Sequence, residues 1–124
     1  MKIKVFFGSI LFSCLSSFAC GVHYIADAEV DLLSKARHGC FEYTDTVKSL
    51  VSWADEDGLY ARCGVHDVAH LAHEDIEAIL GDMRQMLSAT ETDGFVAALK
   101  KSVPDQEIVN KVLVIAHACL VDSQ

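Results

Sequence analysis

The stretch that decides the fold is PDQEIVNKVLVIAHACLV, residues 104–121. Pro104 suits the first position of a helix, and Asp105 and Glu107 stand where the helix dipole favours anions. Residues 108–121 are apolar around most of the helix circumference. Because such a helix must be covered on nearly all sides, we expect it to lie at the centre of the core.

Four further helices are predicted upstream, from apolar residues that recur at spacings of three and four. They cover residues 25–36, ending at Gly39; residues 40–55, with Gly58 as the stop; residues 67–87; and a short segment after Gly94 that Asp93 would cap. No long stretch alternates with the period of two that is typical of a strand. We therefore expect an all-α fold, a single disulfide-bonded bundle of four to five helices over residues 20–124.

The first 19 residues have the layout of a secretory signal peptide. Two lysines precede an apolar stretch, and Ser17-Phe18-Ala19 offers small residues to a signal peptidase, so cleavage is expected after Ala19. The apolar stretch is shorter than the roughly 20 residues that cross a bilayer, which argues against a transmembrane anchor. Lipidation at Cys14 is an alternative. The domain would be secreted or periplasmic, in a bacterium or a eukaryote.

The charge of the chain is strongly acidic. The full sequence has 10 Lys and Arg against 18 Asp and Glu, and two of the lysines lie in the signal peptide, so the mature chain has a net charge of −10. Such a surface repels phosphate backbones and anionic lipids, which makes nucleic acid an unfavourable ligand. The charge favours a basic partner or serves solubility.

Four cysteines remain in the mature chain: Cys20, Cys40, Cys63 and Cys119. An even number in a small exported chain predicts a disulfide framework, and each bridge would contribute about 3 to 4 kcal/mol. Three pairings are open. If the first two helices form an antiparallel hairpin, Cys20 with Cys63 and Cys40 with Cys119 is the favoured one. The close CxxC pairs of a zinc site are absent.

Three histidines, His66, His70 and His73, follow the pattern HxxxHxxH. On one helix they would share an arc of about 60°, with Glu77 one turn further on, so they are candidate zinc ligands. They would also span roughly 10 Å along the axis, which is too far for one zinc ion to bind all three, although a pair is feasible. Solvated surface histidines are the alternative, as is contact with a partner or a response to pH.

Motifs of catalysis are missing from the sequence. It contains no GxSxG, HExxH or phosphate-binding glycine loop, and we expect His117, on the narrow polar stripe of the last helix, to be structural. The pattern favours a non-enzymatic binding protein without a cofactor. Its exposed acidic turns are the candidate partner contacts. Their carboxylates are Asp55 and Asp57 in one turn, and Glu91 and Asp93 in the other.

Six residues form a pattern that runs through almost the whole mature chain: Cys20; Cys40, Tyr43 and Val47 in the order C-x2-Y-x3-V; Cys63; and Cys119. This pattern resembles the Rap/Tai-type periplasmic immunity proteins, which protect bacteria from type VI secretion amidase toxins. The resemblance implies an all-helical, non-enzymatic inhibitor that can dimerise and whose partner is a peptidoglycan-cleaving toxin. Two other functions stay open: a metal-binding protein that uses the histidines, and a secreted effector that acts on a host.

Overall fold

The computed structural model describes residues 26–124, and this part of the chain is helical with no strand. The all-α prediction is confirmed. The predicted signal peptide, Cys14 and Cys20 lie outside the described residues. Within residues 26–124 no helix combines the length and the apolar character that crossing a membrane requires.

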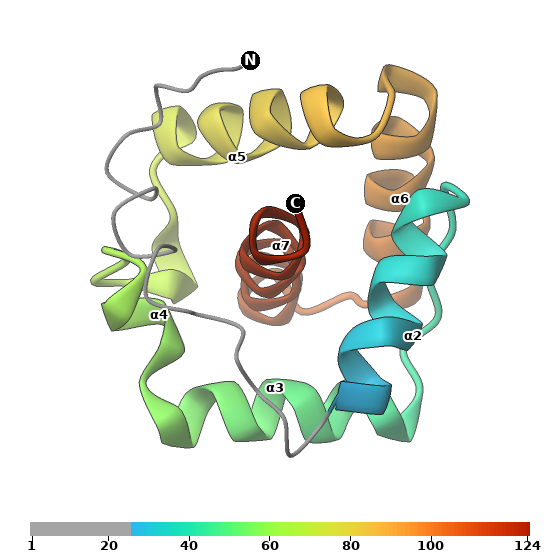
Figure 1. The fold of residues 1–124 in the computed structure, drawn as a ribbon. Coiled ribbons are helices and arrows are strands. Elements are labelled where there is room, and N and C mark those ends of the chain that lie inside the picture. Colours follow the sequence, from blue (N-terminus) through green and yellow to red (C-terminus); the bar gives the residue numbers. More distant parts are fainter. Residues whose placement is uncertain (1–25) are drawn as a thin grey trace.

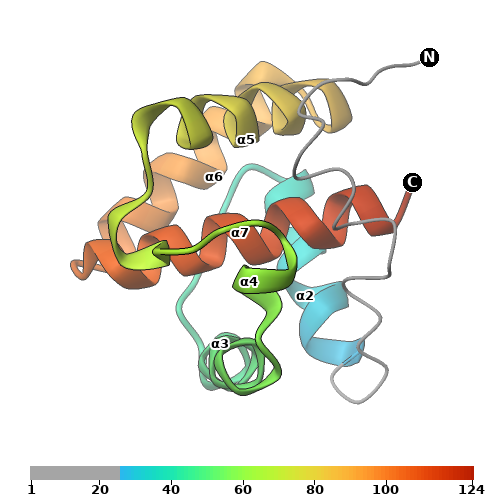
Figure 2. The same ribbon diagram turned by 90° about the vertical axis from the view of Figure 1, so that its left-hand side faces the viewer.

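The last helix, α7, passes through the middle of the molecule, and the other helices surround it (Figure 1). Its bounds are Gln106–Asp122, and eleven of its 17 residues are buried, so the predicted central position is confirmed. Figure 2 shows α7 running between α5 on one side and α3 on the other. The surrounding helices are α2 (Ala26–Arg37), α3 (Asp45–Asp57), α4 (Leu59–Arg62), α5 (His73–Met86) and α6 (Ala89–Ser102).

The residues directly before and after helix α3 determine where it begins and ends. The Thr44 hydroxyl accepts a hydrogen bond from Val47 N at 3.2 Å, so the helix starts five residues later than the apolar pattern predicted. At the other end Gly58 has φ +72° and its N–H donates to Ala54 O, as a left-handed stop does. The single turn α4 follows at once, and no pattern in the sequence predicted it.

The predicted helix over residues 67–87 is wrong in its first turn. Residues Val68–His70 form a short 3-10 helix, and α5 begins only at His73. The cause lies on α7, where the buried Asn110 donates from Nδ2 to Val68 O at 2.9 Å and to Ala69 O at 3.3 Å. A continuous α-helix would use these carbonyls for its own hydrogen bonds, so the side chain from α7 takes the place of the next turn.

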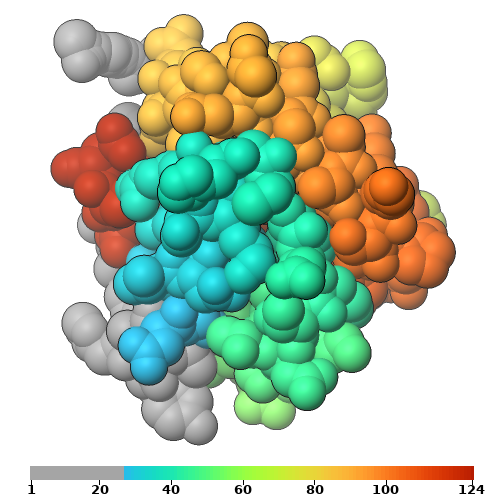
Figure 3. Space-filling view, turned by 90° about the vertical axis from the view of Figure 1, so that its right-hand side faces the viewer, coloured from blue at the N-terminus to red at the C-terminus, as the bar shows by residue number. Residues whose placement is uncertain are grey.

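Helix α6 is longer than the sequence predicted, because Asp93 and Gly94 lie inside it. Its cap is Ser88, whose hydroxyl accepts from Glu91 N at 3.1 Å. Gly94 is needed for packing, since a Cβ there would lie 2.6 Å from Gly39 O in the turn after α2. Figure 3 shows α2 and this turn lying directly against α6. The turn itself needs Gly39, which has φ +67°.

The predicted disulfide between Cys40 and Cys119 is not formed. Cys119 is buried in α7. Cys40 is exposed directly after the turn that follows α2, and its thiol lies 3.5 Å from Lys35 O. Cys40, Cys63 and Cys119 form no disulfide with one another. The predicted bridge from Cys20 to Cys63 involves a residue outside the described part of the chain, and it stays a prediction.

Candidate functional site

Three consecutive carboxylates, Asp55, Glu56 and Asp57, close the last turn of α3, and we call them the α3 acidic end. All three residues are exposed. The last turn holds no basic residue, although the negative end of the helix dipole favours cations there. Compensation comes from other elements, namely α4 and α7. Asp55 and Asp57, two of the acidic residues singled out from the sequence, therefore lie together on one exposed corner.

Lys111 brings a cation from α7 to this corner. Its Nζ lies 3.1 Å from Asp55 Oδ1 and 3.2 Å from Glu107 Oε2. The lysine side chain is only 13% exposed, whereas those of Asp55 and Glu107 are 42% and 47% exposed. Burial alone would lower the pKa of Lys111, but the two carboxylates outweigh it and raise the pKa above its ordinary value. The ammonium thus lies beneath two carboxylates that reach solvent.

Tyr60 of α4 completes what we call the Lys111 cluster, which consists of Asp55, Tyr60, Glu107 and Lys111. The residue is 8% exposed, and its hydroxyl is buried next to the Asp55 side chain. The Lys111 ammonium lies 5.9 Å from the centre of its ring. Burial first, then the charge of Asp55 and a side-chain interaction with that carboxylate, and last the charge of Glu107, raise the pKa of the Tyr60 hydroxyl far above its usual value. The hydroxyl therefore stays protonated beside two carboxylates.

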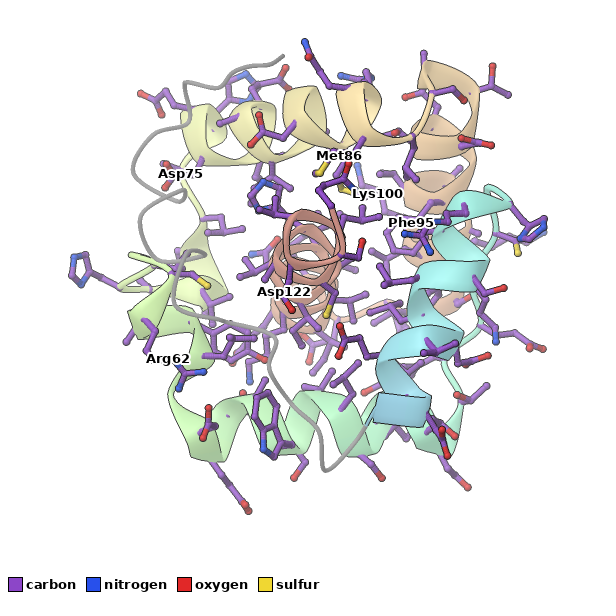
Figure 4. The ribbon with its side chains drawn as sticks, in the orientation of Figure 1. Arg62, Asp75, Met86, Phe95, Lys100 and Asp122 are labelled. Carbon is purple, nitrogen blue, oxygen red and sulfur yellow. The ribbon has the colours of Figure 1, made fainter. Side chains whose placement is uncertain are left out.

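Arg62, the last residue of α4, serves the other side of the α3 acidic end. Its Nη1 donates to Asp57 O at 2.6 Å and lies 2.5 Å from Asp57 Oδ2. Figure 4 places Arg62 on the side of the molecule where α3 ends. Glu56, between Asp55 and Asp57, has no ion pair within the described residues. The corner therefore keeps a surplus of negative charge.

Glu91 and Asp93, the second acidic pair predicted to contact a partner, lie far from this corner. Both residues are on α6, whose first turn is at the opposite corner of the molecule from the end of α3 (Figure 1). Asp93 forms an ion pair with Arg84 of α5 at 3.0 Å, and Glu91 is half-buried against the turn that contains Gly39. The structure therefore does not join the two predicted acidic regions into one surface.

The three histidines do not share a helix face, so the predicted arc of ligands does not form. His66 precedes the 3-10 helix, His70 ends it, and His73 begins α5. All three residues are exposed, and His70 Nδ1 lies 3.1 Å from Asp67 Oδ2. Within residues 26–124 no group of three His, Cys, Asp or Glu side chains is arranged to hold a metal ion.

His117 lies inside the molecule, with a partner that the sequence did not reveal. Its ring is 3% exposed, and Nε2 lies 2.9 Å from Asp82 Oδ2 of α5. The pair joins the central helix to α5, as expected of a structural histidine whose polar atom must be satisfied on burial. Asp82 is 35 residues away, so no local pattern could have identified it.

Residues that sequence reasoning missed at the corner are Tyr60, Arg62, Glu107 and Lys111. The signal that could have found Glu107 and Lys111 is their spacing of four on one helix, which puts both side chains on the same face. Comparison with protein-family models, curated proteins and solved structures found no match to this chain.

Proposed function

We propose that this chain is an exported, non-enzymatic binding protein that contacts a basic protein partner through the α3 acidic end. The observation that carries the proposal is the placement of three exposed carboxylates at the negative end of a helix dipole. Each such charge costs about 0.3 to 1 kcal/mol when it is uncompensated. Stability of the fold gives no reason for Glu56 in particular. Local rules of this kind are commonly broken where a protein binds something.

The fixed positions of the carboxylates at this corner support binding as well. Arg62 and Lys111 each hold one of the flanking carboxylates in place, so the surface needs little rearrangement when a partner arrives. Less conformational freedom is then lost on association, and more of the attraction appears as affinity. The acidic surplus would also speed the encounter with a basic surface at low salt.

The resemblance to Rap/Tai-type immunity proteins gives the partner a class. It supports a secreted peptidoglycan amidase toxin, and the predicted signal peptide would bring the chain to the compartment in which such a toxin acts. Inhibition would then be steric, with the corner of α3 and α7 lying on the toxin surface. No residue of this chain has to perform chemistry for this function.

The test is reconstitution with the toxin or hydrolase encoded beside the gene for this chain. The two proteins are co-expressed in the periplasm, and the complex is isolated through a tag on this chain. We expect a stoichiometric complex and loss of the toxin's peptidoglycan cleavage in an assay with purified cell walls. Absence of a complex, together with undiminished cleavage at a tenfold excess of this chain, would contradict the proposal.

A further inference from the structure

We draw no further inference here: the strongest candidate, the buried side-chain pair of His117 and Asp82 between α7 and α5, restates the structural contact already described for these two helices and, among the described residues, belongs to no group that could hold a metal ion.

Discussion

Two interruptions of helical structure lie on either side of the short helix α4, one at the end of α3 and one before α5, and they have different causes. The end of α3, which we call the local end, is determined by neighbouring residues, because Gly58 turns the chain and its own N–H satisfies Ala54 O. The interruption before α5, which we call the remote end, has its cause far away in the sequence, because Asn110 of α7 donates to the carbonyls of Val68 and Ala69 from more than 40 residues away. At the remote end, the Asn110 side chain of the core helix α7 takes up the free carbonyls, whereas at the local end the three carboxylates of the α3 acidic end stay exposed. That difference makes the α3 acidic end the better candidate for binding.

The end of α2 combines a local glycine turn with a contact from a distant helix, and we expect it to be the most sensitive of the three to substitution. Gly39 turns the chain locally, and Gly94 of α6 lets a distant backbone approach it. Gly94→Ala would place a Cβ 2.6 Å from Gly39 O, and neither backbone segment can move cheaply, so we expect a loss of about 3 kcal/mol in the free energy of unfolding. Urea denaturation followed by circular dichroism measures this.

Gly81→Ala is the control for that substitution. Gly81 lies within α5, and a Cβ there meets nothing within 4 Å. Because alanine is the better helix former, we expect a gain of up to about 1 kcal/mol. Equal effects at the two glycines would show that the contact between Gly39 and Gly94 is absent.

The remote end is broken by Asn110→Ala. The substitution leaves Val68 O and Ala69 O without their side-chain donor, for which we expect a loss of about 2 kcal/mol. Amide hydrogen exchange should rise first in residues 66–72, since Asn110 holds this segment on α7. Gln106→Ala removes only the part-buried hydrogen bond that Gln106 donates to Asn110 Oδ1 and should cost less than half as much. Unchanged exchange in the Asn110→Ala chain would argue against a remote end.

The local end is tested by Gly58→Ala. The new methyl group would meet no atom within 4 Å, so the only cost is the left-handed backbone at φ +72°, about 1 kcal/mol. Binding to a partner should survive, because the carboxylates precede the substitution. A loss as large as that of Gly94→Ala in the same denaturation experiment would mean that the turn carries tertiary contacts that the structure does not show.

Alkaline pH tests the ties between the local end and α7. Tyr60 and Lys111 both have pKa values raised above their ordinary values of 10.0 and 10.5. Their contribution is therefore complete below about pH 10 and is lost as the pH rises, because the unfolded chain then releases protons that the folded chain retains. We expect the unfolding free energy to fall above pH 10. Tyr60→Phe should flatten that slope, and an unchanged slope would show that Tyr60 is not shielded.

The sequence was sufficient where local chemistry decides the structure. The apolar circumference of residues 108–121 predicted the central helix, and Gly58 predicted the end of α3. It was insufficient where a distant residue decides. The helix start at Asp67 failed because Asn110 captures carbonyls across the core, and Gly94 looked like a break because the approach of Gly39 cannot be read from neighbouring residues.

The candidate site shows the same division. Asp55 and Asp57 were found from the sequence because three adjacent acids before a glycine predict an exposed turn. Tyr60 and Lys111 were missed because α4 and α7 bring them to the corner only in the folded chain. The histidine arc was drawn on a continuous helix, and it disappeared with that helix.

The central claim is that the α3 acidic end binds a basic protein partner, and one measurement tests it most directly. Isothermal titration calorimetry compares two triple amide variants for binding to the captured toxin. Asp55→Asn, Glu56→Gln and Asp57→Asn change the corner, whereas Glu74→Gln, Asp75→Asn and Glu77→Gln change α5 by the same charge. We predict at least about tenfold weaker binding for the first variant and less than about twofold for the second. Equal weakening of both would reduce the effect to net charge and contradict the claim.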